Sequence, residues 1–410
     1  MGKIKSAMKS AITTITGPLM NWIYKDGFYM SANTVVGHKG PVWLDTSKPY
    51  ILYNTIPQLK SVITRKASMF SNMELHLIDI KSKKRIEDKE LDKLLQNPNA
   101  LQSQNDFLRQ FKEQEQVYGN QFIYKNVPSA LLTYPVALWN ISPALMYPEL
   151  TGKLFDQVDV NEIIQKYTYR LIDVTREFKP EQILYSRIND LDNPIVGKSP
   201  IIALKYPMSN IEASYEYRNV LMKEKGALGI LSNDSKDAIG AIPLTDPERE
   251  RVENAYINKY GIEAGQRRVI LTNASLKWQA MSYPTKDMML FEEVDANLIT
   301  IVDMFGMNIN MFSNKAATFE NVKQSIIQVY QDTIMPEADQ FTQALSKFLK
   351  IKEGQRLVAS YEHIPILKEN KLVGMKALES IIVSLTKAIE GGILTIDQAK
   401  LMLASELGLS

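Results

Sequence analysis

The chain of 410 residues contains no cysteine and three histidines, which excludes disulfides, cysteine nucleophiles and zinc sites built from cysteine. Its 48 basic and 46 acidic side chains leave a net charge of +2, which is too balanced for a protein that reads duplex DNA with a concentrated basic face. No stretch is long and apolar enough to cross a bilayer, so we expect no membrane-spanning helix.

The first half of the chain mixes helical and strand-like patterns without regular alternation, which predicts an α+β fold. It begins with a basic arm at residues 1–25 that Gly17-Pro18 interrupts. The elements expected after it are a helix at 55–70, a strand at 74–80, helices at 88–95 and 104–118, and strands at 121–125, 158–173 and 178–185. A dinucleotide-binding fold is not expected, because no Gly-x-Gly-x-x-Gly follows a strand.

A helix expected at 201–225 ends at Gly226 and leads into a small unit at 227–283. The unit is expected to hold a strand at 228–231, a polar loop at 232–237, a helix from Thr245, and paired strands at 268–271 and 276–281. Thr245 and Glu248 have the spacing of a capping box. We therefore expect Glu248 to cap this helix and not to catalyse a reaction.

The next expected helix, at 284–304, carries five acidic residues against the single lysine Lys286. The acidic residues are Asp287, Glu292, Glu293, Asp295 and Asp303. Two interpretations remain open, an ordinary solvated face and the wall of a channel, and periodicity alone does not choose between them.

A third helix is expected at 318–349, with an apolar stripe that starts at Phe319 and a kink at Pro336. Two short helices, at 372–389 and 396–407, follow on either side of Gly391-Gly392. Thr395 and Gln398 predict a capping box at the start of the last helix.

Several short motifs recur in the same order in a known family. They are Gly197-Lys198-Ser199-Pro200, the segment 226–231, the charged helix 246–260, Phe305-Gly306-Met307, the segments 318–321 and 332–336, and the closing segment 391–395. Over roughly residues 190–405 the chain resembles the head-to-tail portal proteins of tailed bacteriophages. The first 190 residues match only in general character.

The resemblance implies a homo-oligomeric ring, typically of twelve subunits, at the portal vertex of a virion assembled in the host cytoplasm. Double-stranded DNA would be packaged and ejected through its channel without sequence preference, and the ring would join head to tail. The implied partners are the terminase motor, a head-tail adaptor, and the major capsid and scaffolding proteins. The resemblance implies no enzyme activity, cofactor, metal or membrane.

The resemblance also implies a portal-like division of the chain, with an α/β wing, two stem helices, a small clip, a long kinked helix and a short helical crown. The expected boundaries are arm 1–25, wing 26–200, first stem helix 201–226, clip 227–283, second stem helix 284–305, tunnel loop 306–317, long wing helix and strand 318–370, and crown 371–410. A large C-terminal barrel, present in some members of the family, is not expected.

Three groups of candidate site residues follow from these positions. The DNA-facing tunnel loop would present Asn308, Asn310, Met311, Phe312, Asn314 and Lys315. The acidic channel wall would consist of Asp287, Glu292, Glu293 and Asp295, and the docking surface of the clip would include Asn233, Asp234, Lys236 and Asp237. An acidic wall would repel the phosphates of the duplex from all sides. This suits a channel, because a wall that bound phosphates would stop DNA from sliding.

Two other classes of function compete with the portal interpretation. One is a capsid or tail-adaptor protein that assembles without a DNA channel. The other is a metal-dependent nucleic-acid enzyme, which needs carboxylates that converge on a cation. The candidate pairs, Asp190 with Asp192 and Asp234 with Asp237, lie in turn-like segments where aspartate is common for its hydrogen bonds to the backbone.

Overall fold

The computed structural model describes residues 47–129, 131–152, 160–223, 229–233, 245–248, 250–251, 254, 276–280, 290–312, 318–391 and 395–400. The helices are α2 (Pro49–Thr55), α3 (Pro57–Ser71), α4 (Lys89–Gln96), α5 (Gln104–Tyr118), α6 (Val160–Ile163), α7 (Lys205–Lys223), α9 (Leu290–Met304), α10 (Phe319–Val329), α11 (Met335–Phe348) and α12 (Pro365–Glu390). Short 3-10 turns occupy Pro143–Leu145, Pro180–Gln182, Pro200–Leu204 and Ile309–Met311. The predicted α+β class is confirmed.

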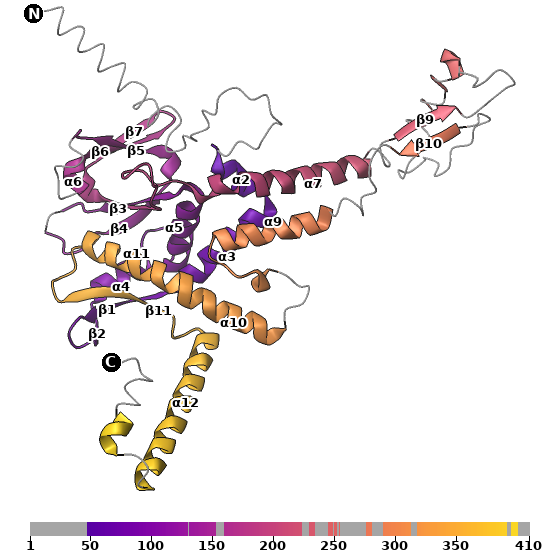
Figure 1. Cartoon of the computed structure of the whole chain (residues 1–410). Helices are drawn as coiled ribbons and strands as arrows, with labels where there is room; N and C mark the ends of the chain where they lie inside the picture. Colours follow the sequence, from indigo (N-terminus) through magenta and orange to yellow (C-terminus); the bar gives the residue numbers. More distant parts are fainter. Residues whose placement is uncertain are drawn as a thin grey trace, which may run out of the picture.

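The strands form small antiparallel sheets. They are β1 (Glu74–Asp79), β2 (Arg85–Ile86), β3 (Asn120–Asn126), β4 (Ala137–Ile141), β5 (Met146–Leu150), β6 (Ile164–Leu171), β7 (Val174–Phe178), β8 (Ile183–Arg187), β9 (Gly229–Asn233), β10 (Leu276–Ala280) and β11 (Gln355–Ser360). Their orders are β11-β1-β2, β4-β3-β8, β5-β6-β7 and β10-β9. The body of the molecule contains the first three, and β9 and β10 lie beyond the far ends of α7 and α9 (Figure 1).

The main core lies where α3 and α5 pack against α11. Phe111 contacts Phe341 with ring centroids 4.7 Å apart, and Phe70 meets Phe341 edge-on at 5.8 Å. The same core includes Ile301 and Val302 of α9 and Phe305, which follows the helix. The C-terminal end of α9 is therefore built into the body, while a second, smaller core fills the space around β3, β6 and β8.

Local signals explain why the helices of the body were predictable. The side chain of Ser103 caps α5 by accepting a hydrogen bond from the backbone N–H of Asp106, and Gly119 follows the helix at φ 71°. Asp88 caps α4 in the same way by accepting from two backbone N–H groups. Pro57 occupies the first turn of α3, where its missing N–H costs nothing.

Several predicted elements differ from the structure. Residues 158–173, expected to form strand structure around turns, form α6 and then β6, and 158–159 lie outside the described residues. The strand β10 pairs with β9, with Leu276 opposite Asn233, whereas its expected partner 268–271 is not among the described residues. The helix α12 starts at Pro365, seven residues before the predicted start, because a proline suits the first turn of a helix.

The long helix after the loop is interrupted close to the predicted kink. A π-turn, Tyr330–Ile334, separates α10 from α11, and the N–H of Met335 bonds the carbonyl of Tyr330 five residues earlier. Pro336 follows immediately and has no N–H, so regular hydrogen bonding is lost around it. The predicted stripe begins later than expected, since Phe319 is 85% exposed.

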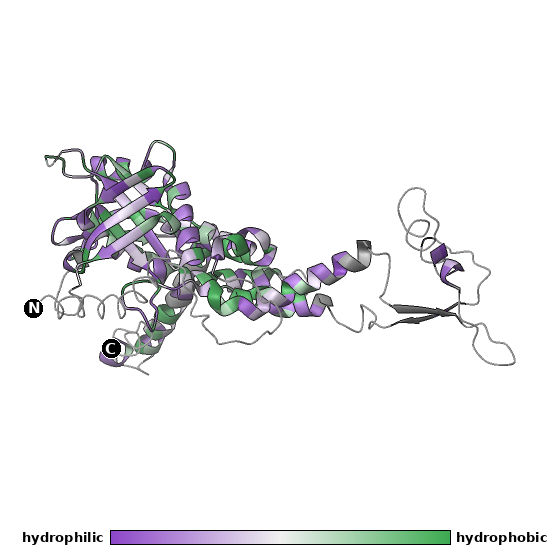
Figure 2. Ribbon diagram, turned by 90° about the horizontal axis from the view of Figure 1, so that it is seen from above, coloured by the Kyte–Doolittle hydropathy of each residue, from purple (hydrophilic) through white to green (hydrophobic). Residues whose placement is uncertain are grey.

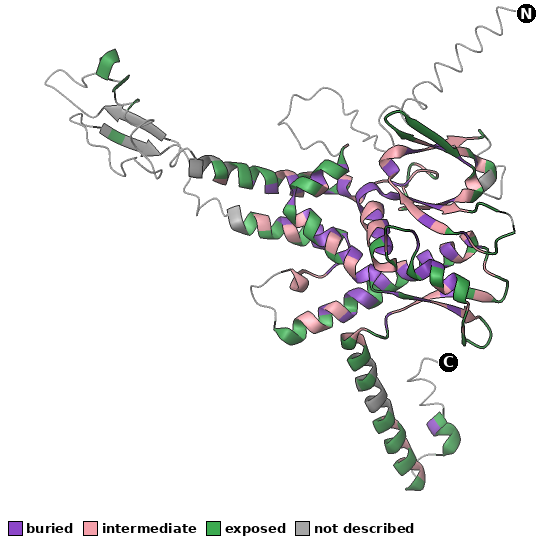
Figure 3. Cartoon of the chain, turned by 180° about the vertical axis from the view of Figure 1, so that it is seen from behind, coloured by how far each residue is buried: buried purple, intermediate pink, exposed green. Residues whose placement is uncertain are grey.

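Burial and hydropathy divide the molecule into a packed body and projecting parts. Hydrophobic positions concentrate in the helices of the body, whereas the coloured part of α7 is mostly polar (Figure 2). Every described side chain of α12 is exposed or only partly buried (Figure 3).

Candidate functional site

The helices α7 and α9 run side by side away from the body (Figures 1 and 3). A polar contact joins them, in which Asn210 Nδ2 donates to Glu293 Oε1 at 3.0 Å. The same carboxylate accepts from Asn297 Nδ2 at 2.9 Å. Glu293 is therefore turned toward α7, and its carboxylate is used within the subunit.

The other acidic residues of α9 share a different face. At about 100° per residue, Glu292, Asp295 and Asp303 fall within one stripe, and all three are exposed. The described helix carries four carboxylates and no lysine or arginine. Of the predicted wall, Glu292 and Asp295 lie together, Glu293 lies apart, and Asp287 is outside the described residues. Asp303 joins the stripe, and its helical spacing from Glu292 was visible in the sequence.

A left-handed glycine ends α9 and starts the loop. The N–H of Gly306 bonds the carbonyl of Asp303, and the N–H of Met307 bonds that of Val302 at 3.0 Å. With Gly306 at φ 64°, this is a Schellman motif, which favours glycine because other residues are strained there. The predicted helix end at Phe305-Gly306-Met307 is confirmed.

The first residues of the candidate tunnel loop are tied to the body. Asn308 caps the 3-10 turn Ile309–Met311 by accepting from the N–H of Asn310. Asn310 Nδ2 donates to Ser325 Oγ at 3.0 Å, and the partly buried Met311 and Phe312 pack on the main core. Asn314 and Lys315 lie outside the described residues.

The motif Gly197-Lys198-Ser199-Pro200, here called the latch, joins the junction of α5 and β3 to the segment that precedes α7. Asn120 bonds Gly197 twice, donating to its carbonyl and accepting from its N–H, each at 2.8 Å. Ser199 Oγ donates to the carbonyl of Val117 at 2.6 Å. A Cβ on Gly119 would lie 2.3 Å from the carbonyl of Lys198. The motif itself could be recognised in the sequence, but no sequence pattern indicated that Asn120 binds it.

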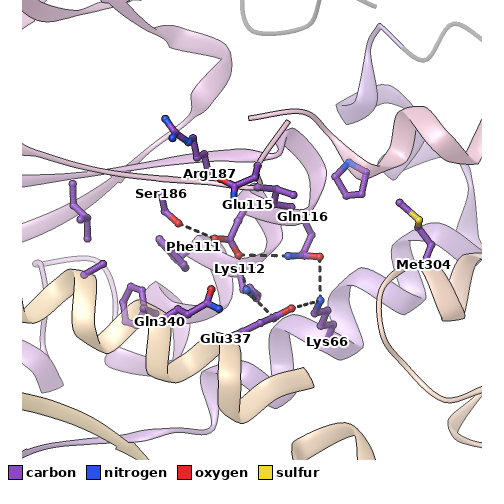
Figure 4. Close-up of a pocket in the computed structure, with 16 residues that line it drawn as sticks. Lys66, Phe111, Lys112, Glu115, Gln116, Ser186, Arg187, Met304, Glu337 and Gln340 are labelled. Atoms are coloured by element: carbon purple, nitrogen blue, oxygen red, sulfur yellow. Dashed lines mark hydrogen bonds and ion pairs between the residues drawn. The ribbon is translucent and has the colours of Figure 1, made fainter. Parts of the chain in front are cut away.

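A cluster of buried charges, which sequence analysis missed, joins α3, α5 and α11 beside a cavity of about 430 Å³. Glu337 of α11 holds Lys66 at 2.8 Å and Lys112 at 2.9 Å, and Lys112 also pairs with Glu115. Figure 4 shows these side chains converging, with Ser186 bonded to Glu115. Residues 271 positions apart in the chain meet here, so no local pattern could predict it.

The charged side chains of this cluster shift the pKa values of one another. Burial is the largest influence on the pKa values of Lys66, Lys112 and Glu337. Burial lowers the pKa of Lys66, and the charge of Lys112 lowers it further. Burial opposes ionisation of Lys112 and Glu337 as well, but Glu115 and Glu337 raise the pKa of Lys112, and the two lysines lower the pKa of Glu337. The cluster is best described as a structural ion network.

The other predicted site residues have structural roles or lie outside the described residues. Asn233 ends β9, whereas Asp234, Lys236 and Asp237 are not described. Glu248 caps its helix as predicted, accepting from the N–H of Thr245 at 3.0 Å. The Thr245 hydroxyl, and after it this N–H, lower the pKa of the Glu248 carboxyl.

Two features of the described residues bear on the rival classes of function. No three histidine, aspartate or glutamate side chains there are grouped to hold a metal ion. Asp190 accepts from the backbone N–H of Asp192, as in a turn.

No helix in the described part of the chain is long and apolar enough to cross a membrane.

Comparison with solved structures gives the fold. The neck of an empty gene transfer agent particle, computed with C6 symmetry, superposes with a TM-score of 0.60 at 18% identity, over 90% of this chain and 97% of the other. The neck of a native particle, computed with C12 symmetry, gives 0.59 at 18% identity, over 90% and 96%. An HK97-family phage portal protein from Corynebacterium diphtheriae gives 0.50 at 10% identity, over 76% and 96%.

Comparison with sequences gives the family. No curated protein matches the chain. The profile of the phage portal protein family matches residues 57–403, which span the described elements from α3 to α12. The chain therefore belongs to the phage portal protein family and is a viral portal protein.

Proposed function

We propose that twelve copies of this chain close into a ring at one vertex of a viral capsid, and that α9 and the loop 306–317 line its DNA channel. The proposal is supported by family membership and by the C12 symmetry of a similar neck structure. Head-to-tail contacts that close after a fixed number of copies produce such rings. The family is structural, and the proposal includes no catalytic step.

The observation that carries the channel assignment is the acidic stripe of Glu292, Asp295 and Asp303 on the exposed face of α9. Repeated around a ring, it surrounds the axis with negative charge. Each phosphate that a protein neutralises adds affinity through counterion release. A wall without cations avoids this affinity, keeps the duplex centred and lets it slide.

The loop after α9 supplies the closest approach to DNA. Its described residues Asn310, Met311 and Phe312 are anchored to the body, so we assign the contact to the residues beyond Phe312. Lys315 is the one cation of the loop sequence 306–317 and would meet phosphates once per subunit. Such a contact touches the backbone without reading base edges.

The unit 227–283 would dock the packaging motor or the tail adaptor. Its strands β9 and β10 lie beyond the stem helices, away from the body (Figure 1). Deletion of residues 233–238 should leave rings intact and abolish binding of the motor or adaptor. Loss of the rings themselves would show that this segment belongs to the subunit interface.

The test of the channel is the amount of DNA packaged per procapsid. The combined change Glu292→Lys and Asp295→Lys should reduce packaging and make DNA binding more salt-dependent, because added cations bind phosphates. The matched control, Glu87→Lys with Glu353→Lys, makes the same change of charge on exposed positions of the body. Lys315→Ala should alter packaging or retention of DNA while rings still form.

Equal packaging by the wild type, the stripe variant and Lys315→Ala would contradict the channel assignment. Rings without an axial hole would favour an adaptor that lacks a channel. A stable monomer would favour the enzyme class of function.

A further inference from the structure

We propose that Thr333, on the π-turn of the long helix, is the positioning residue of the tunnel loop. Thr333 Oγ1 donates to the carbonyl of Gly306 at 2.8 Å. Gly306 is the residue at which α9 ends and the loop begins. Thr333 does not face DNA in this proposal, and it acts through the base of the loop.

The hydrogen bond joins the two ends of the segment that runs from Gly306 through the loop and α10 to Thr333. The loop leaves α9 at Gly306 and enters α10 at Thr318, whose side chain caps that helix by accepting from the N–H of Asn321. The helix α10 then runs into the π-turn, and Thr333 returns to Gly306. Both ends of the loop are therefore fixed by one element, and a shift of the π-turn moves them together.

The contact is also tight by shape. A Cβ on Gly306 would lie 2.9 Å from Thr333 Oγ1 and 3.1 Å from its methyl group. The glycine is thus required both for its positive φ and for the approach of Thr333. A hydrogen bond between residues 27 positions apart is unusual for a threonine in a helix, which more often bonds the carbonyl four residues before it.

The π-turn accounts for the direction of Thr333. In a π-turn, successive residues are rotated about the helix axis by less than the ~100° per residue of an α-helix. Tyr330 and Ile334 of the same turn stay in the core, with Tyr330 against Tyr361 at 5.3 Å between ring centroids. Thr333 is thereby turned further from Tyr330 than an i,i+3 neighbour in an α-helix would be. Single-turn π segments are frequent at functional sites.

The absence of cysteine from the sequence makes a direct measurement possible. Ser313→Cys, a near-isosteric change in the loop, carries a nitroxide label in assembled, DNA-free rings. Distances between labels on different copies then report the position of the loop. Labelled rings that keep Thr333 are compared with two variants. Thr333→Val keeps the shape of the side chain and loses the hydroxyl, whereas Thr333→Ser keeps the hydroxyl.

The matched control is Thr386→Val in α12, where the hydroxyl also makes a 2.8 Å bond, but to the carbonyl of Ile382 within its own helix. Thr333→Val should broaden the distribution of distances between labels. The population in which the loop has left its parent position should increase about fivefold, the factor expected for the loss of one net hydrogen bond. Thr333→Ser and Thr386→Val should match the parent ring.

An unchanged distribution for Thr333→Val overturns the proposal, and so does a Thr333→Ser variant that behaves like Thr333→Val. Because the rings hold no DNA, this result is independent of whether the loop lines a DNA channel. The consequence for function rests on the proposed channel: Thr333→Val should also change the amount of DNA retained in filled heads, whereas Thr386→Val should not.

Discussion

The body and the projecting parts of this portal protein are stabilised in different ways. In the body, helices from distant parts of the chain meet around buried rings and the buried pairs of Glu337. In α12, by contrast, all described side chains are exposed or partly buried, among them Leu372 and Ile382. The body is therefore stabilised by packing within the chain, whereas α12 contributes little buried surface.

The largest expected effect comes from the latch that joins the α5–β3 junction to the segment before α7. Gly119→Ala combines a positive φ of 71° with a clash against the backbone of Lys198, and should lower the free energy of unfolding by about 4 kcal/mol. Gly354→Ala is the matched control, since its φ is 83° with open space around it, and should cost about 1 kcal/mol. Chemical denaturation of the two variants measures the difference. Equal losses would mean that the latch adds nothing beyond backbone strain.

The next effect compares a buried with an exposed ion pair of the same length. Glu337→Gln leaves Lys66 and Lys112 without their shared carboxylate and should cost roughly 3 kcal/mol. Glu369→Gln removes the partner of Lys323, also at 2.8 Å but exposed, and should cost less than about 1 kcal/mol. Denaturation curves for both variants decide whether burial, and not distance, determines the contribution.

The buried network should also make the body sensitive to acid. The lysines hold the pKa of Glu337 below its usual value. Its contribution to stability is therefore complete above the unfolded pKa of about 4.3 and is lost as pH falls through the lower folded pKa. Stability measured from about pH 7 down to about pH 3 should fall less steeply in Glu337→Gln than in the wild type. Parallel curves would show that the pKa of Glu337 is the same in the folded and unfolded states.

The smallest effect separates two neighbouring carboxylates of α9. Glu293→Gln weakens the contacts with Asn210 and Asn297 and should cost less than about 1 kcal/mol, as for an exposed hydrogen bond. Glu292→Gln, on the other face, should leave stability unchanged and alter only DNA passage. A stability loss in Glu292→Gln equal to that in Glu293→Gln would contradict their assignment to different faces.

Local chemistry made part of this architecture predictable. The limits of α5, the end of α9 at Gly306 and the cap of Thr245 by Glu248 all follow from signals within a few residues. The position of the interruption in the long helix followed from Pro336, although its form as a π-turn did not.

Contacts between distant segments could not be predicted in this way. The pairing of β10 with β9, the binding of Gly197 by Asn120 and the ion network around Glu337 depend on tertiary packing. The acidic residues of α9 were visible in the sequence, but their division between two faces became clear only when Asn210 was placed beside Glu293.

The most direct test of the account is an image reconstruction of the assembled protein by cryo-electron microscopy. We predict a closed ring of twelve copies with an axial channel, in which Glu292, Asp295 and Asp303 of every copy face the axis. A ring whose α9 stripe lies on the outer surface or in the contact between copies would contradict the account, because the acidic wall would then be absent from the path of DNA.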